Sequence, residues 1–150
     1  PNIAEARVLM CYIYLRKGEK QKARAEIFRV CEQFPNDALP YFFKALLHRL
    51  DGEYDESLKS LDKRQYLDPI SAVATYVDRA RIYLLQGDYE RALKELDYGS
   101  AVEPNYKALK LFRAQILFYK GEAEEAICIS KTFLAENPQS EAIHLLLAIF

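Results

Sequence analysis

Residues that break helices recur in this chain of 150 residues at a nearly fixed interval, and this interval constrains the fold more than any other feature. Two series keep the same spacing, and each glycine stands half a period before its proline: Pro35, Pro69, Pro104 and Pro138, and Gly18, Gly52, Gly87 and Gly121. Glycine tolerates the positive φ at which a helix can end and turn, whereas proline prevents a helix from continuing. Each period therefore predicts a helix, a tight turn, a second helix and a loop.

Between these breakers the apolar residues follow a helical spacing. After Gly18, for example, Ala23, Ile27 and Val30 fall on one stripe of a helix. The period between Pro69 and Pro104 is longer by one residue, which is assigned to the loop at 68–71, where an insertion costs little. The pattern predicts first helices over 4–17, 39–51, 72–86, 106–120 and 140–150, and second helices over 20–33, 54–67, 89–102 and 122–136.

Small and aromatic residues repeat in the same phase. Small residues occupy two fixed positions of each period: Ala23, Ser57, Ala92 and Ala126 at one, and Cys11, Ala45, Ala80 and Ala114 at the other. Tyrosines occupy two further positions in some of the periods: Tyr14 and Tyr83 at the first, and Tyr41 and Tyr76 at the second.

Together with the period, these small and aromatic residues resemble those of tetratricopeptide repeats. In that family the small residues let paired helices approach closely, and the aromatic residues fill the space between neighbouring repeats. The chain departs from the pattern at His48 and Leu117, which replace the first tyrosine, and at Arg7 and Lys110, which replace the second aromatic residue.

The resemblance implies an all-α fold, a right-handed α-solenoid of helix-turn-helix hairpins. We expect one domain over 1–150, with about four repeats at 4–37, 38–72, 73–106 and 107–140 and the first helix of a fifth at 141–150. Pro1 is in phase with the loop prolines, and the last residues stop within a helix that has no partner. Because a solenoid normally ends in a repeat with a polar outer face, this segment is expected to belong to a longer array.

Stacked first helices line the concave side of such an array. The inner faces of these helices are located by residues at fixed distances before each loop proline. One such row is Val8, Phe42, Val77 and Leu111; a second is Tyr12, Leu46, Arg81 and Gln115; and Arg49 lies beside them. These residues predict an apolar groove for an amphipathic helix or an apolar peptide whose carboxylates meet the arginines. Each guest side chain buried there could contribute ~1.5–3 kcal/mol before ordering costs. The alternative is that these residues bury against one another, or against a flanking segment of the same protein.

Other functions of helical repeats are disfavoured. Tetratricopeptide domains that hold the C-terminal carboxylate of heat-shock chaperones use lysines, asparagines and arginine on the first helices, but the corresponding positions here carry Val8, Tyr12, Phe43, Ala74 and Asp78. Pentatricopeptide repeats read RNA with polar side chains on a basic surface, whereas this inner face is apolar and the net charge is -1. No nucleic-acid partner is therefore predicted.

Two further hypotheses remain: a scaffold that self-assembles through its uncapped ends, including 145–150, and the regulatory region of a larger enzyme or signalling protein.

The sequence contains no motif that predicts catalysis, so we expect a non-enzymatic protein without a cofactor. His48 and His144 are the two histidines, and they lie in different repeats, which favours a structural or solvent-exposed role over metal binding. The longest apolar run, from Val8 to Leu15, is far shorter than the ~20 residues that cross a bilayer. The three cysteines are predicted to be reduced and mostly buried, as in a cytoplasmic protein.

Overall fold

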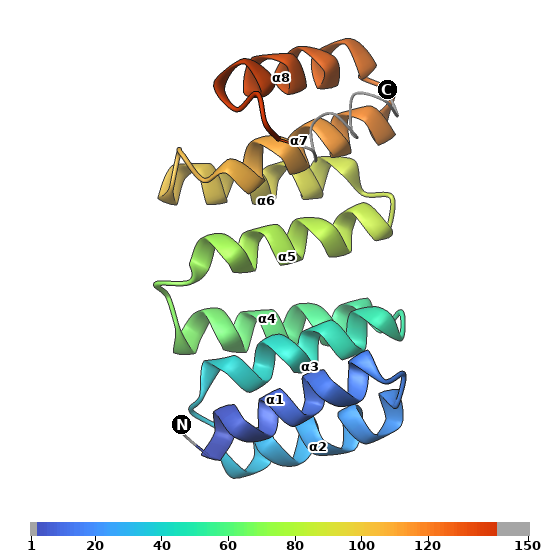
Figure 1. The fold of residues 1–150 in the computed structure, drawn as a ribbon, viewed down its shortest axis with the longest axis vertical. Coiled ribbons are helices and arrows are strands. Elements are labelled where there is room, and N and C mark those ends of the chain that lie inside the picture. Colours follow the sequence, from blue (N-terminus) through green and yellow to red (C-terminus); the bar gives the residue numbers. More distant parts are fainter. Residues whose placement is uncertain (1–2, 141–150) are drawn as a thin grey trace. The chain divides into compact units, whose positions relative to one another are not determined.

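The computed structural model describes residues 3–140, and this part of the chain consists of helices joined by short connections (Figure 1). The helices are α1 (Ile3–Arg16), α2 (Lys20–Gln33), α3 (Ala38–Leu50), α4 (Tyr54–Leu67), α5 (Ala72–Leu85), α6 (Tyr89–Val102), α7 (Lys107–Lys120) and α8 (Ala123–Glu136). Their ends differ from the predicted ones by no more than one residue. The predicted helix that ends at 150 falls on residues 141–150, which lie outside the described part.

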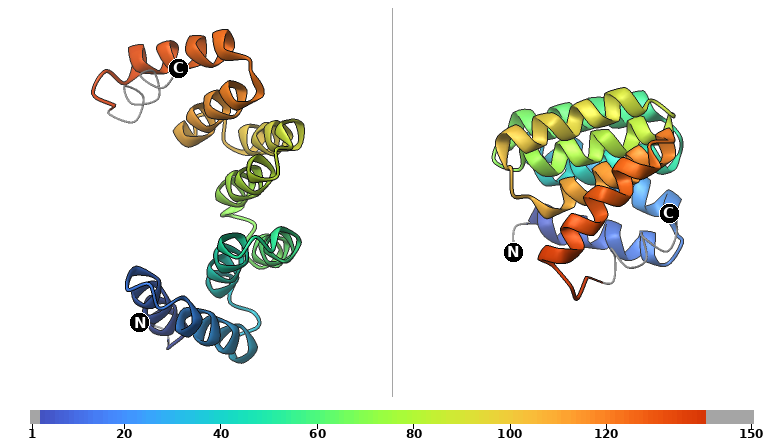
Figure 2. Two further views of the ribbon diagram at one scale, coloured as in Figure 1. Left: turned by 90° about the vertical axis from the view of Figure 1, so that its right-hand side faces the viewer. Right: turned by 90° about the horizontal axis from the view of Figure 1, so that it is seen from above.

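The four periodic glycines end the first helix of each pair, as the spacing predicted. Their φ angles are 75°, 75°, 75° and 97°, in the left-handed region. In each turn the residue after the glycine donates its amide to the carbonyl five residues earlier; one example is Asp88 N to Tyr83 O at 2.9 Å. This bond satisfies a carbonyl that the end of the helix leaves without a partner. The turn therefore brings the second helix back along the first, and Figure 2 shows the two helices of each pair side by side.

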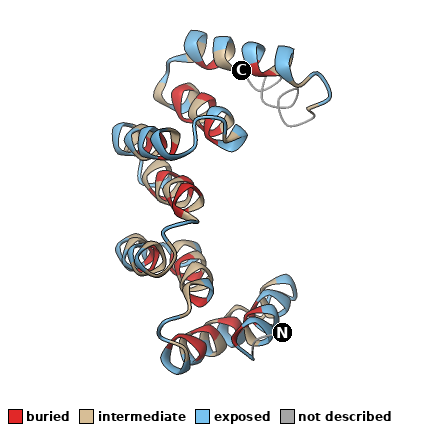
Figure 3. Cartoon of the chain, turned by 90° about the vertical axis from the view of Figure 1, so that its left-hand side faces the viewer, coloured by how far each residue is buried: buried red, intermediate tan, exposed pale blue. Residues whose placement is uncertain are grey.

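The described residues divide into two compact units: an N-terminal unit that contains α1–α4 and ends at Ser71, and a C-terminal unit that begins at Ala72 and contains α5–α8. The division falls at the end of the loop to which the sequence assigned the extra residue. Within each unit, the first helix packs against the second and third, and the third packs against the fourth. In both units, buried residues lie mainly on the faces where these helices meet (Figure 3).

The core of the N-terminal unit is formed by α1, α2 and α3. Its fully buried members are spaced three or four residues apart on their helices, and they are Ala4, Val8, Cys11, Ala23, Ile27, Val30 and Leu47. Tyr14, Leu15 and Phe43 pack against this cluster and remain partly exposed. The buried stripe follows from the helical repeat of 3.6 residues, which aligns such residues on one face.

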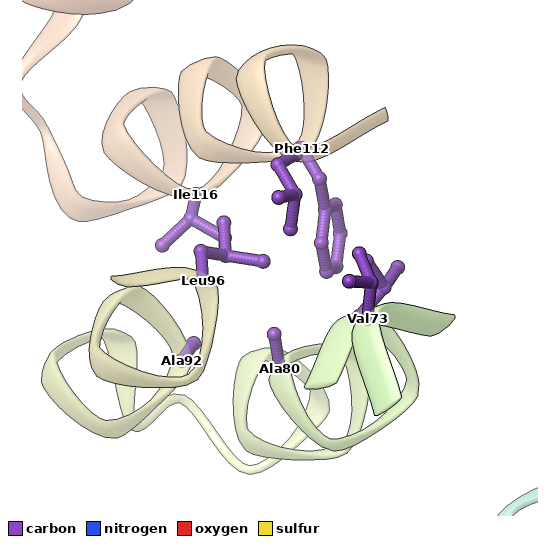
Figure 4. Close-up of a cluster of buried hydrophobic side chains, with 8 residues drawn as sticks. Val73, Ala80, Ala92, Leu96, Phe112 and Ile116 are labelled. Atoms are coloured by element: carbon purple, nitrogen blue, oxygen red, sulfur yellow. The ribbon is translucent and has the colours of Figure 1, made fainter. Parts of the chain in front are cut away.

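The core of the C-terminal unit lies between α5, α6 and α7. Figure 4 shows Phe112 of α7 pointing toward Val73 of α5, and Ile116 of α7 lying beside Leu96 of α6. Val77, Ala80, Ala92 and Leu109 complete the buried cluster. Each unit thus has a core in which three helices take part, as expected for hairpins that bury their apolar faces by stacking.

All eight small residues at the two repeating positions are buried, as the family resemblance implied for residues between paired helices. At the contact between α3 and α4, the Ser57 hydroxyl donates a hydrogen bond to the Ala45 carbonyl oxygen over 2.7 Å. A larger side chain at either residue would separate the two helices.

None of the helices described between residues 3 and 140 is long and apolar enough to cross a membrane.

Replacement of Gly87 tests the role of the periodic glycines. A Cβ atom at this residue would meet no heavy atom within 4 Å, so the cost of Gly87→Ala comes from the backbone alone. Because φ is 75°, we expect the substitution to destabilise the protein by about 1–2 kcal/mol. The measurement is chemical denaturation followed by circular dichroism. Gly87→Asn serves as the control and should cost less, because asparagine tolerates this conformation. Equal stability of Gly87→Ala and the wild type would contradict the interpretation.

Candidate binding surface on the first helices

The five predicted groove residues of the N-terminal unit are placed differently. Val8 is only 2% exposed and belongs to the core. Tyr12 is 45% exposed, and its hydroxyl accepts a hydrogen bond from the Arg16 guanidinium over 3.3 Å. Phe42, Leu46 and Arg49 are half-buried. Four of the five side chains therefore retain surface that a partner could contact.

Phe42 is held in place from two sides. Its ring meets the Phe43 ring edge-on, with 5.2 Å between the centroids, and the Arg64 guanidinium of α4 lies 5.0 Å from the Phe42 centroid. The electron-rich face of an aromatic ring attracts a cation, so Arg64 orients the Phe42 ring. Phe42 is consequently a partly exposed apolar surface that is packed on two sides.

The four predicted residues of the C-terminal unit are also only partly accessible. Val77 is 9% exposed and lies in the core, whereas Leu111 and Gln115 are half-buried. Arg81 donates to Asp78 over 3.2 Å, and its guanidinium lies 5.4 Å from the centroid of the Phe112 ring. Arg81 is therefore already paired with a carboxylate and an aromatic ring of its own unit.

The prediction that all nine side chains line an open surface is wrong for Val8 and Val77. Val8 lies four residues after Ala4 and three before Cys11, and all three face the same core. Val77 lies three residues before Ala80 in the other core. An apolar residue on a first helix can be buried by the neighbouring first helix of the same unit. The sequence pattern does not distinguish such a buried residue from one that lines an open groove.

Sequence reasoning missed most of an exposed apolar surface on α1, of which it predicted only Tyr12. Five large apolar side chains of this helix are each more than two-fifths exposed: Ile3, Leu9, Met10, Tyr12 and Ile13. At ~100° per residue they span about half of the helix circumference, opposite the core stripe of Ala4, Val8 and Cys11. The signal was present in the unbroken apolar run from Val8 to Leu15, because a helix can turn only part of such a run toward one core.

A polar cluster joins α2 to the turn between α3 and α4. His48 is 4% exposed; its Nδ1 lies 2.5 Å from Glu53 Oε2, and its ring meets the Phe28 ring edge-on at 5.4 Å. The Arg24 guanidinium binds both Asp51 and Glu53, and Lys20 also pairs with Asp51. Hydrogen bonds from His48 and Arg24 stabilise the ionised carboxylate and lower the pKa of Glu53.

This arrangement gives His48 a structural role, as expected, and it explains why a histidine can replace the family's tyrosine. The ring fills the aromatic site against Phe28, and Glu53 satisfies Nδ1. Among residues 3–140, no group of three or more His, Cys, Asp or Glu side chains could hold a metal ion. His144 lies outside the described residues.

Removing the charge of Glu53 should make stability less dependent on pH. A carboxyl whose pKa is lowered on folding adds stability above its unfolded pKa, near 4.5, and that stability is lost as the pH falls through the folded value. We therefore expect Glu53→Gln to lower Tm at pH 7 and to differ progressively less from the wild type as the solution is acidified below pH 4.5.

The control for this experiment is Glu124→Gln, which alters an exposed glutamate in the first turn of α8. Thermal unfolding of the three proteins over the same pH series is compared. An equal loss of Tm for Glu53→Gln at all pH values would show that the ionised pair does not stabilise the fold.

The thiols fall into two classes. Cys11 and Cys31 are buried, and burial raises the pKa of each thiol to about 11. Cys128 on α8 is exposed, unlike the other two, so the expectation of mostly buried thiols holds for two of the three. All three are free cysteines.

Alkylation at pH 8 should therefore modify Cys128 alone in the native protein. A thiol of pKa about 11 is ionised in roughly one molecule in a thousand at this pH, and the thiolate is the reactive form. Mass spectrometry after timed iodoacetamide treatment would locate the label. Treatment in urea provides the fully labelled reference. Comparable native rates at all three cysteines would refute this assignment.

Comparisons with known proteins identify the fold. No family model matches the sequence, and no curated protein matches it. Among solved structures, a thermophilic tetratricopeptide-repeat protein of Thermus thermophilus is 18% identical, with a TM-score of 0.82 over 99% of this chain and 81% of that one. MamA from Desulfovibrio magneticus RS-1 is 17% identical, with a TM-score of 0.74 over 99% of this chain and 84% of that chain. The structure of the Cut9–Hcn1 hetero-tetramer of the APC/C matches at 16% identity with a TM-score of 0.77, over 95% of this chain and 29% of that one.

The chain is accordingly an all-α solenoid protein with the tetratricopeptide-repeat fold, as the spacing of its glycines and prolines predicted. Fewer than one in five aligned residues are identical between this chain and each of these structures, so the likeness concerns the fold.

Proposed function

We propose that this chain is a non-catalytic protein-interaction module that binds an amphipathic helix or an apolar peptide along the first helices of its N-terminal unit. The observation that carries this proposal is the exposed apolar half of α1, with Ile3, Leu9, Met10, Tyr12 and Ile13. Helices of globular proteins normally turn polar residues to solvent, and a contiguous exposed apolar surface of several side chains indicates an interaction site.

The polar groups beside this surface suit a helical guest. Glu5 and Arg16 lie on the exposed half of α1 and give it one charge of each sign, which is compatible with the charged edges of an amphipathic helix. On α3, which packs against α1, Phe42 and Leu46 add partly exposed apolar area, and Arg49 adds a cation. The binding surface proposed here is therefore Leu9 and Tyr12 on α1 with Phe42, Leu46 and Arg49 on α3. Leu111, Gln115 and Arg81 form a smaller candidate surface on the C-terminal unit.

The comparisons support this class of function. The Cut9–Hcn1 structure, which this chain matches over 29% of the other chain's length, is a hetero-tetramer of two kinds of protein. We infer by analogy that this chain acts as an adaptor or scaffold for a protein partner. The free, buried thiols Cys11 and Cys31 are in keeping with a reducing compartment such as the cytoplasm.

Peptides selected on the protein from a random display library test the proposal. The peptides should carry apolar residues three and four positions apart. Leu9→Asp and Tyr12→Asp should each weaken their binding about 10- to 100-fold, because each variant removes an apolar anchor worth ~1.5–3 kcal/mol. Fluorescence anisotropy of a labelled peptide measures the affinity, and circular dichroism checks that each variant is folded.

Val102→Asp is the matched control, because Val102 is an exposed apolar residue at the end of α6. It should leave affinity unchanged. Equal affinities for the wild type and both α1 variants would exclude α1 as the site. If instead Leu9→Asp converts an oligomer into a monomer in light scattering, the surface joins copies of this chain, and the proposal of a peptide guest is replaced by self-assembly.

A further inference from the structure

An apolar pocket lies in the C-terminal unit, between α7 and α8, and it reaches the end of α6. Its volume is about 290 Å³, and its lining includes Leu109, Ile129 and Phe133 as apolar walls, with the exposed thiol of Cys128 beside them. Cavities of about half this volume accept a benzene molecule in other proteins. The pocket is thus large enough for one aromatic ring together with the group that carries it.

The preceding repeat shows why the pocket exists. Gly121 corresponds there to Gly87, so each lining residue on α7 or α8 has its counterpart 34 residues earlier in the sequence. In the preceding repeat the corresponding region holds two tyrosines, Tyr76 and Tyr98, whose ring centroids are 5.9 Å apart. Their counterparts around the pocket are Lys110 and Thr132. Two aromatic rings of one repeat are therefore replaced in the next by side chains without rings, whereas Gly99 is replaced by the buried ring of Phe133.

The cation that accompanies these rings is retained. Arg79 lies with its guanidinium 5.8 Å from the centroid of the Tyr76 ring. Its counterpart one repeat later is Arg113, which lines the pocket and pairs with Asp97 of α6. Lys110 is 46% exposed and its Nζ lies 3.6 Å from Glu136 Oε2, so its ammonium is drawn to a carboxylate at the rim. The arginine of the preceding repeat is thus retained in the lining of the pocket.

We propose that this pocket binds the tyrosine side chain of a protein partner, which takes the place that the chain's own tyrosine occupies in the preceding repeat. Three observations on this chain support such a ring: the apolar walls, the volume, and the presence in the lining of Arg113, the sequence counterpart of the Arg79 that contacts Tyr76. The negative face of an aromatic ring and the positive guanidinium are complementary in charge. The pocket belongs to the C-terminal unit, whereas the proposed peptide surface lies on α1 of the N-terminal unit. An experiment can therefore refute either proposal while the other stands.

The probe for this proposal is p-cresol, which is the side chain of tyrosine as a free molecule. Because Cys128 lines the pocket, bound p-cresol should shield its thiol, and alkylation of Cys128 should become about tenfold slower at saturation. Cyclohexanol is of similar size but has no aromatic face, so it should protect far less. N-acetyltyrosinamide should protect at least as well as p-cresol, since the ring of a partner protein carries a backbone.

Two lysine variants on α7 identify the site. Lys110→Tyr restores the ring that the preceding repeat has, so it should fill the pocket, raise Tm and abolish protection by p-cresol. Lys107→Tyr makes the same chemical change at an exposed residue of the same helix that does not line the pocket, and it should leave protection intact. Chemical-shift changes in the NMR spectrum of the wild type, confined to the residues around the pocket, give a second measure of binding.

Each contrary result overturns the proposal. Absence of both protection and NMR shift changes at millimolar p-cresol would show that the pocket does not take a ring. Equal protection by cyclohexanol would show that the aromatic face is not recognised. Protection by p-cresol but not by N-acetyltyrosinamide would assign the pocket to small free phenols rather than to a partner's side chain.

Discussion

The close approach of the two helices in each pair is the contact on which the rest of the structure depends. It is made through small buried residues, and at one of these sites the Ser57 hydroxyl reaches the Ala45 carbonyl of the opposite helix. Because backbones this close leave no room for large side chains between them, the larger apolar residues must project toward the next helix of the unit. They form the two cores, in which Leu47 and Leu96 are fully buried.

This arrangement also determines where surface remains for binding. A first helix is covered by its paired helix and by the next first helix of its unit, so side chains on its remaining faces stay accessible. On α1 those faces are apolar, and Leu9 and Tyr12 are left exposed. Between α7 and α8 the repeat pattern itself changes: Lys110, Thr132 and Phe133 stand where the preceding repeat has Tyr76, Tyr98 and Gly99, and a pocket lies beside them. One candidate surface thus follows from the geometry of stacking and the other from a departure from the repeat.

The positions of the helices could be predicted closely, but the exposure of individual residues could not. Glycine and proline act on the local backbone, so their spacing locates the helix ends within one residue. Val8 was predicted to face a guest, yet it lies in the core; Met10 and Ile13 were not predicted as surface, yet they are exposed. The sequence places all three within one apolar run, and which side of that run meets α2 and α3 depends on how the three helices pack.

By itself, the sequence determined the all-α repeat, the turns at the glycines and the small residues at the contact of paired helices, because each of these depends on backbone conformation or side-chain size at a fixed spacing. The tertiary structure alone decided that Val8 and Val77 are core residues, that His48 is paired with Glu53, and that an apolar pocket lies beside Cys128. These features depend on which side chains of separate helices come into contact, and periodicity along one helix does not contain that information.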